Sequence, residues 1–250
     1  MIDQKAFYVV AREPGAEHPA LPTWANVGLN PIGLELGPYS RAVTKLSVEG
    51  VPGCYQLLDV LAPGECQGFI QLSERLGYLP DAAVSLPREI RHNDNLVWIV
   101  DAATDEIIWR RAVVAVMADL MPFDGKRPLG INARFRFYRY RPGDYFKPHT
   151  DGSWPGSRVI DRRLITNAYT DRYSLMTFLI LLNDDFEGGA TRFFVPNRVE
   201  EERRVVDVRT PAGGVLCFPH GLHPWHCTHS SEPIVNGTKY IIRTDVLFEL

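Results

Sequence analysis

The hydrophobic pattern of the chain has a helical period in its first half and an alternating period in its second half. Residues 65–78 place apolar side chains at helical spacing after the start signal Pro63-Gly64, and residues 104–120 form a second predicted helix that ends before Pro122. Beyond this point apolar and polar residues alternate, as they do in half-buried strands. The predicted strands cover residues 134–140, 173–182, 191–195, 203–208, 214–218 and 238–248.

Two helices followed by a run of strands predict an α+β fold that is mostly β. The turns between the strands favour two antiparallel sheets packed as a jelly roll, or double-stranded β-helix, with the N-terminal helices supporting one face. Residues 11–53 are rich in proline and glycine, which is typical of an extended segment with many turns. We therefore expect residues 1–54 to form an arm packed on the core and residues 55–250 to form a single domain.

The composition is that of a globular protein with a sizeable core. Hydrophobic residues make up 45% of the 250 residues, and charged residues make up 23%. The net charge of −3 argues against nucleic acid as a partner, and no apolar stretch is long enough for a membrane helix. The N-terminus lacks the features of a signal peptide. Without paired cysteine spacing we expect free thiols in a cytoplasmic protein, at Cys54, Cys66, Cys217 and Cys227.

Two histidines and one carboxylate provide the candidate chemistry. In KPHTDGSW, His149 and Asp151 stand two residues apart, so on an extended backbone both side chains point the same way. His229 follows in HSSEPIVNGTKY. Such a set holds a metal on one face and leaves other coordination positions open, as in non-haem Fe(II) oxygenases. An H-x-D triplet by itself is more often part of a surface loop, so the prediction depends on the complete set.

The third ligand has competitors, because three more histidines precede His229 at intervals of three residues. A glycine and a proline among them argue against a helix that would align all four. We select His229 because of the segment that follows it, which contains Pro233, Gly237 and Lys239. The remaining histidines are expected to be loop or rim residues; they are His220, His223 and His226.

Together these motifs resemble the Fe(II)/2-oxoglutarate oxygenases of the prolyl 4-hydroxylase type over residues 55–250. The pattern of that family has a strand tyrosine, H-x-D, a strand that runs into L-N-D with a Gly-Gly turn, a G-x-x-x-x-F strand, and a distal histidine with Pro, Gly and Lys. The matching segments here are Tyr140, His149-Thr150-Asp151, LILLNDDFEGGATRFF, GGVLCF and HSSEPIVNGTK. The resemblance implies that residues 55–250 are a single catalytic domain of this oxygenase type.

The resemblance also implies the reaction. His149, Asp151 and His229 would hold Fe(II), while 2-oxoglutarate and O2 take the open positions. An unactivated C–H bond of the substrate would be hydroxylated with release of succinate and CO2, and ascorbate would serve as reductant. Asp151 matters here, because related halogenases have a small residue at that position to make room for halide.

The far carboxylate of 2-oxoglutarate needs a cation, because an unpaired buried charge is prohibitively costly. Lys239 and Arg243 lie on the same face of the last predicted strand. The family pattern assigns the anchor to Lys239, whereas a guanidinium is the better bidentate partner. The cation not used would form a structural ion pair, for example with Asp245. Tyr140 and Thr177 match positions that hydrogen-bond the cosubstrate in the family, and the alternative for both is an ordinary strand residue.

Two classes of function remain open at this stage. The alternative to the oxygenase is a cupin-like jelly-roll protein that binds another metal or a small ligand. A cupin would cluster its histidines within each of two motifs and would need no cation after the last one, so Lys239 favours the oxygenase. The candidate substrates are a prolyl residue in a peptide or protein, an amino-acid-like small metabolite, and a nucleobase, against which the net charge argues.

Two further features concern the substrate. Residues 152–172 have little periodicity and directly follow the candidate ligands, so they form either a lid over the substrate or a surface insertion. Arginines near the candidate site predict a locally basic mouth; they are Arg134, Arg136, Arg139, Arg141, Arg158, Arg162, Arg163 and Arg172.

Overall fold

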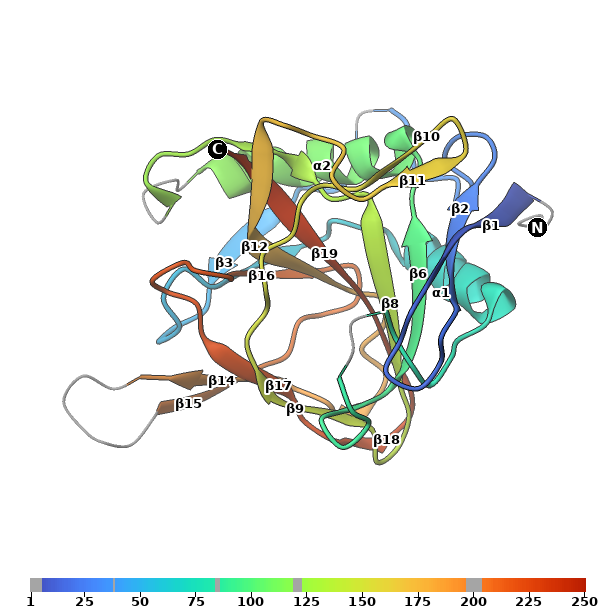
Figure 1. Cartoon of the computed structure of the whole chain (residues 1–250). Helices are drawn as coiled ribbons and strands as arrows, with labels where there is room; N and C mark the ends of the chain where they lie inside the picture. Colours follow the sequence, from blue (N-terminus) through green and yellow to red (C-terminus); the bar gives the residue numbers. More distant parts are fainter. Residues whose placement is uncertain (1–5, 38, 84–85, 119–122, 197–203) are drawn as a thin grey trace.

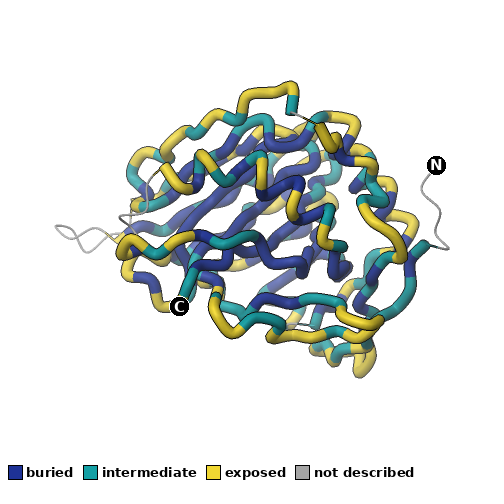
Figure 2. Tube along the Cα trace, turned by 90° about the horizontal axis from the view of Figure 1, so that it is seen from above, coloured by how far each residue is buried: buried dark blue, intermediate teal, exposed yellow. Residues whose placement is uncertain are grey.

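The structure, a computed structural model, describes residues 6–37, 39–83, 86–118, 123–196 and 204–250. It is mostly β, with a large mixed sheet facing a smaller antiparallel sheet (Figure 1). The interior between the layers is filled by buried strand residues, while exposed segments gather at the periphery (Figure 2). The predicted fold class, a jelly roll with supporting N-terminal helices, is confirmed.

The strands of both sheets come from distant parts of the chain. The large sheet has the order β1 (Phe7–Glu13), β2 (Leu21–Asn26), β6 (Asp94–Ile99), β8 (Arg134–Tyr140), β19 (Lys239–Glu249), β12 (Arg172–Leu181), β16 (Val215–Pro219), β4 (Tyr55–Leu58), β3 (Thr44–Ser47), and β7 (Pro128–Ile131) also pairs with β19. The smaller sheet has the order β15 (Arg204–Val208), β14 (Thr191–Val195), β17 (Thr228–Ser231), β9 (Tyr145–His149), β5 (Arg91–His92). Two short pairs complete the fold, β10 (Arg158–Ile160) with β11 (Arg163–Ile165) and β13 (Glu187–Gly188) with β18 (Ile234–Asn236).

Two helices, α1 (Pro63–Leu76) and α2 (Ala102–Met117), pack on the large sheet, on the side away from the smaller sheet (Figure 1). Both predicted helices are therefore confirmed, with ends shifted by a few residues; the last positions of the second prediction lie outside the described residues. Asp101 caps α2 by accepting hydrogen bonds from the backbone N–H groups of Ala103 (3.0 Å) and Thr104 (3.1 Å). A carboxylate at this position offsets the unpaired N–H groups of the first turn.

The central strand β8 is buried on both faces, because helices cover one and the smaller sheet covers the other. Phe137 points to the helices, where its ring lies 6.1 Å from that of Phe69 in α1. Arg136, Tyr138 and Tyr140 alternate with it and point into the barrel. The expectation of a half-buried strand was therefore wrong. The alternating residues of this strand point into two different buried environments. The same sequence pattern is found in a strand with one buried and one solvent-exposed face, so the pattern alone cannot distinguish the two cases.

The first fifty residues contribute strands to the large sheet at both of its ends. β2 pairs with β6 in parallel, and β3 pairs with β4. Asp101 also binds this part of the chain, accepting from the Asn26 side chain and the Asn30 backbone, both at 3.0 Å. The division of the chain at residue 54 stays a prediction.

The segment 152–172 is more regular than its sequence suggests. It contains the β10–β11 hairpin, whose turn residues Asp161 and Arg162 have positive φ angles of 49° and 59°. A two-residue turn with both φ angles positive matches the twist of paired strands. Arg158 forms an ion pair with Asp105 of α2, so the hairpin is tied to the helical layer.

Two expectations from composition are met. Cys54, Cys66, Cys217 and Cys227 are all buried free thiols. Within the described residues, neither helix is long and apolar enough to span a membrane.

The best-shielded ion pair between the two helices gives a stability prediction. Glu65 of α1 receives two hydrogen bonds from Arg111 of α2, at 2.7 and 2.8 Å, and the side chains are only 9% and 3% exposed. Removing one partner leaves the other buried without a counter-charge, so Glu65→Ala should lower the free energy of unfolding by about 3–5 kcal/mol. Urea denaturation monitored by circular dichroism measures this change.

The matched control is the pair Glu106–Arg110 on α2, whose side chains are 59% and 57% exposed. Glu106→Ala should cost less than about 1 kcal/mol, because solvent screens an exposed pair. Equal losses in the two variants would show that burial does not govern the strength of the helix–helix pair.

Candidate active site

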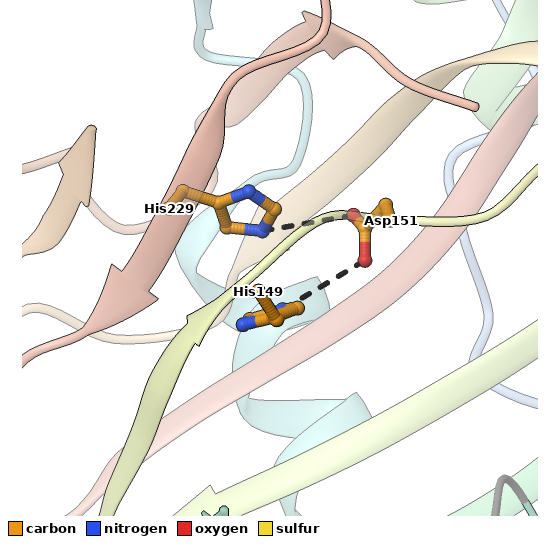
Figure 3. Close-up of side chains that lie close together, drawn as sticks. All are labelled: His149, Asp151 and His229. Carbon is orange, nitrogen blue, oxygen red and sulfur yellow. Dashed lines mark ion pairs between the residues drawn. The ribbon is translucent and has the colours of Figure 1, made fainter. Parts of the chain in front are cut away.

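The three candidate ligands meet inside the barrel, on the smaller sheet. His149 ends β9 and lies opposite His229 of β17 in the strand register, and Asp151 follows two residues after His149 (Figure 3). The Nε2 atoms of His149 and His229 lie 3.9 and 3.8 Å from the Asp151 carboxylate oxygens. The ligand atoms all lie within 4.8 Å of one another, and within the described residues no other group of three such side chains converges in this way. The predicted trio is therefore brought together by the fold.

Hydrogen bonds orient both imidazoles. Nδ1 of His149 lies 2.8 Å from the carbonyl oxygen of Lys147, and Nδ1 of His229 lies 3.2 Å from that of Cys227. A carbonyl only accepts, so each Nδ1 carries the proton, and the Nε2 lone pairs face Asp151. Phe146 stacks on His149 with ring centroids 3.6 Å apart, which fixes the ring. The pair is thus held in the tautomer that metal ligands require.

The surroundings also set the charges. Burial lowers the pKa of His149 to about 4, helped by the neighbouring His229, and burial likewise lowers the pKa of His229. Burial acts to raise the pKa of Asp151, but Arg243 and the two histidines outweigh it and hold that pKa well below its usual range. At neutral pH the site therefore offers two neutral imidazoles and one carboxylate. This nitrogen and oxygen donor set suits Fe(II).

A chain of hydrogen bonds behind Asp151 involves Thr177. Its hydroxyl donates to Asp151 Oδ2 at 2.7 Å and lies 2.9 Å from Nδ1 of His220. Since the single hydroxyl proton goes to Asp151, His220 Nδ1–H is the donor to Thr177. His220 Nε2 lies 3.0 Å from the hydroxyl of Ser174, which accepts from the backbone N–H of Trp154 at 2.7 Å. Thr177 therefore orients Asp151; its predicted contact with the cosubstrate stays a prediction.

The three other histidines lie in the loop between β16 and β17, as expected. His220 and His223 are buried, and only His226 is exposed. His220 directly follows β16, whose neighbour β12 supplies both of its hydroxyl partners. The glycine and proline around it indicated correctly that no helix forms, but absence of a helix does not imply exposure.

The interior row of β19 places the two candidate cations at different depths. Lys239, Ile241 and Arg243 lie opposite Tyr140, Tyr138 and Arg136 in the register. One pocket is lined by the His149–Asp151–His229 trio and by both cations. Arg243 therefore lies beside the trio. Lys239 lies two inward-facing positions away, toward the start of β19.

The charge of Arg243 is already matched by carboxylates. Its Nε lies 3.3 Å from Asp151 Oδ2 and its Nη2 lies 3.0 Å from Asp245 Oδ1. Although burial alone would lower it, these two carboxylates raise the pKa of Arg243 above its usual value. The structural ion pair with Asp245 that the sequence suggested is present.

Lys239 has no such match, although it is 1% exposed. Its Nζ donates to the Gly189 carbonyl at 2.7 Å and to the Ser231 hydroxyl at 3.2 Å, and no carboxylate of the described residues lies within ion-pair distance. Burial, with a smaller effect from Arg209, lowers the pKa of Lys239 to about 7. Tyr140, fully buried, hydrogen-bonds Asn93 and Ser231 beside it. A bound anion would supply the missing counter-charge.

The predicted basic mouth is largely neutralised. Arginines of that set form ion pairs with acidic residues, in the pairs Arg134–Glu13, Arg139–Glu74, Arg139–Asp94, Arg141–Asp94, Arg158–Asp105 and Arg172–Asp171. Arg136 reaches Asp245 only at 3.5 Å and shares it with Arg243. Their number in the sequence therefore overstates the positive charge around the site.

Comparison with known proteins agrees with the predicted oxygenase. Residues 135–244 match the model of the 2OG-Fe(II) oxygenase superfamily. The matched segment contains all three candidate ligands, His149, Asp151 and His229. The protein is a 2-oxoglutarate-dependent dioxygenase, as predicted, and not the cupin-like alternative. The match implies Fe(II), 2-oxoglutarate and O2 as the reactants.

Solved structures agree in fold. A prolyl hydroxylase from Trichoplax adhaerens, in complex with a hypoxia inducible factor oxygen degradation domain peptide fragment, has a TM-score of 0.52 at 16% identity and covers 79% of this chain and 83% of its own. A Pseudomonas putida prolyl-4-hydroxylase has a TM-score of 0.49 at 17% identity and covers 78% and 91%. No curated protein sequence matches significantly. At 16% identity the likeness to the Trichoplax protein describes the fold alone.

The pKa values of the histidines predict how metal binding depends on pH. A ligand histidine must be neutral, and an ordinary imidazole titrates near about pH 6.5. Because burial lowers the pKa of His149 to about 4 and lowers that of His229, protons compete with the metal only at more acidic pH. Mn(II) affinity should therefore change less than about threefold between pH 7.5 and pH 6 and fall steeply near pH 4–5. Calorimetric titration measures this, and a tenfold loss by pH 6 would contradict the lowered pKa values.

Proposed function

We propose that the protein is a hydroxylase in which His149, Asp151 and His229 hold Fe(II) and Lys239 holds the far carboxylate of 2-oxoglutarate. The observation that carries this proposal is one pocket with two neutral imidazoles and a carboxylate near a buried lysine that has no carboxylate partner among the described residues. The bound metal, with 2-oxoglutarate and O2, supplies the oxidation that hydroxylates an unactivated C–H bond and releases succinate and CO2. We also propose ascorbate as the reductant.

The residues around the trio prepare it for this role. Thr177 and Arg243 both contact Asp151 Oδ2, so Oδ1 is left to face the metal position. Phe146 and Phe218 pack against the two imidazoles and restrict water there. These contacts let the ligand set hold its geometry before the metal arrives, which reduces the reorganisation that binding requires.

The assignment of the anchor to Lys239 follows from charge balance. Arg243 serves two carboxylates, whereas the ammonium of Lys239 lies against a carbonyl and a hydroxyl only. A dicarboxylate that reaches from the trio to Lys239 would remove this imbalance. Tyr140, whose hydroxyl lies in the same polar group with Ser231, is proposed as a further partner of the cosubstrate. The predicted contact of Arg243 with 2-oxoglutarate is not part of this proposal.

The proposed substrates are a prolyl residue in a peptide or protein and an amino-acid-like small metabolite. The Trichoplax protein, whose structure includes a peptide fragment, shares the fold and so supports the first. Four free thiols agree with a reducing compartment, and we propose the cytoplasm. A lid role for residues 152–172 also stays a proposal, and hydrogen exchange with and without ligands would test it.

The proposed ligands can be tested one at a time. His149→Ala, Asp151→Ala and His229→Ala should each abolish stoichiometric Fe(II) binding and lower succinate formation by at least about a hundredfold, because each removes one of three protein ligands. His226→Ala is the matched control, since His226 is exposed in the same loop region, and it should keep wild-type activity. Metal content and succinate are measured on the same samples. Normal metal content in His229→Ala would overturn the ligand assignment.

The two cations should give different losses. Lys239→Ala should raise the 2-oxoglutarate concentration needed for half-maximal succinate formation by about thirtyfold or more, because a buried carboxylate loses its charge partner. Arg243→Ala should instead weaken Fe(II) binding, because Asp151 and Asp245 lose the guanidinium between them. Lys239→Arg should fall between wild type and alanine, since charge remains but length and shape change.

Thermal unfolding of each variant provides the control for folding. The reverse result would assign the anchor to Arg243. In that case a folded Arg243→Ala protein would no longer bind 2-oxoglutarate, and Lys239→Ala would bind it normally.

A further inference from the structure

A second and larger cavity of about 390 Å³ lies beside the pocket of the trio. Tyr138 lines both, so the two spaces share a wall. The cavity is bounded by β6, by the β8 residues Arg134 and Arg136, by Trp154 of the 152–172 segment, and by Glu13 of β1. Its volume is at the lower end of the range for small-molecule sites, about 300–1,000 Å³. Its position makes it the approach to the metal from the side opposite Lys239.

The lining of this cavity is positively charged. Among the described residues, three guanidiniums line it, those of Arg91, Arg134 and Arg136, and one carboxylate, that of Glu13. Glu13 is engaged by Arg134 through two hydrogen bonds, at 2.9 and 3.0 Å. This pair therefore balances itself.

Arg136 is a cavity guanidinium with a weak match. Its hydrogen bond to Asp245 Oδ2 is long, at 3.5 Å, and Asp245 also serves Arg243 at 3.0 Å. Its other contact is the ring of Trp154, with Cζ 5.2 Å from the centroid. The side chain is only 7% exposed, so the cavity is where its remaining N–H groups can find acceptors. Burial and the nearby Arg243 lower the pKa of Arg136 to about 10, which agrees with a charge in need of an anion.

We propose that the cavity binds a small substrate through its carboxylate, with Arg136 as the carboxylate partner and Trp154 covering the guanidinium. The inference rests on the proposed function, because it names the substrate class of that site. A planar guanidinium can form two parallel hydrogen bonds with a carboxylate, which fixes direction as well as affinity. A substrate held there extends past Tyr138 toward the trio, so the carbon to be oxidised is one at a distance from the carboxylate.

The same features argue against a blocked peptide as the best substrate. A residue inside a peptide chain has no free carboxylate, so it would leave Arg136 without an added partner. The cavity is also small, at about 390 Å³, and its walls come from several separate segments of the chain. A free amino acid or other small carboxylic acid fits both conditions.

The experiment compares acids with their neutral forms. The probes are L-proline and L-leucine, their carboxamides, and a proline-containing peptide blocked at both ends. In the wild-type protein the free acids should raise the unfolding temperature of the metal-free protein and stimulate succinate formation, and the carboxamides should do so at least about tenfold less effectively.

The variants assign this preference to one residue. Arg136→Gln should raise the KM for the acids about thirtyfold or more and remove the acid–carboxamide difference, while the KM for 2-oxoglutarate changes less than threefold. Arg136→Lys should restore part of the preference. Arg139→Gln is the matched control, because Arg139 lies on the same strand but points to Glu74 and Asp94, outside the cavity; it should keep the acid preference.

The outcomes separate this inference from the proposed function. Turnover of the blocked peptide in preference to the acids, or an unchanged acid preference in Arg136→Gln, would overturn the cavity proposal while the hydroxylase stands. A thermal shift by the acids that depends on Arg136, in a protein that forms no succinate with any probe, would support the cavity and refute the hydroxylase.

Discussion

Buried charge must be balanced inside a protein, and this constraint organises the barrel interior. Asp151 carries a full negative charge away from bulk water, and Arg243 and Thr177 hold it in place. Arg243 in turn is shared with Asp245, which is shared with Arg136. Along β8 and β19 the ions thus form a connected row in which most charges are matched within the chain. Where the match fails, at Lys239 and at Arg136, the fold indicates where anions of a reaction would bind.

The layers around this row determine how it is built. Helices α1 and α2 cover the outer face of β8, and the apolar side chains of that face pack in the core between them. The inner face of the strand can therefore carry polar side chains. The pair Arg134–Glu13 shows that the N-terminal residues serve the interior as well, because Glu13 of β1 neutralises an arginine of β8. Residues outside the family match thereby help to shape the space beside the metal position.

Much of the fold could be predicted because its signals are local. Both helices have start or stop signals, and β8, β12 and β19 have apolar runs or alternation. β6 was missed because DNLVWI is a short apolar run, which periodicity cannot assign. The strands β10 and β11 were missed because their three residues each are too short to show a period.

The candidate site shows the same division between local and distant information. The H-x-D spacing and the segment after His229 were enough to select the three side chains that the fold brings together. The buried role of His220 was missed, because it depends on Ser174 and Thr177 from another strand. The neutralised arginines were missed for the same reason: Glu13 and Asp105 are far from their partners in the sequence.

The hydrogen-bond chain from Trp154 through Ser174, His220 and Thr177 to Asp151 has a thermodynamic consequence. Its first member is a wall of the larger cavity, and its last is a candidate metal ligand. Each link has one proton and one direction, so a displacement of the Trp154 backbone would act on the carboxylate through the strength of the links between them. The two spaces are therefore energetically linked, and linkage is reciprocal. If a ligand in the larger cavity changes the affinity for the metal by some factor through this chain, the bound metal changes the affinity for that ligand by the same factor.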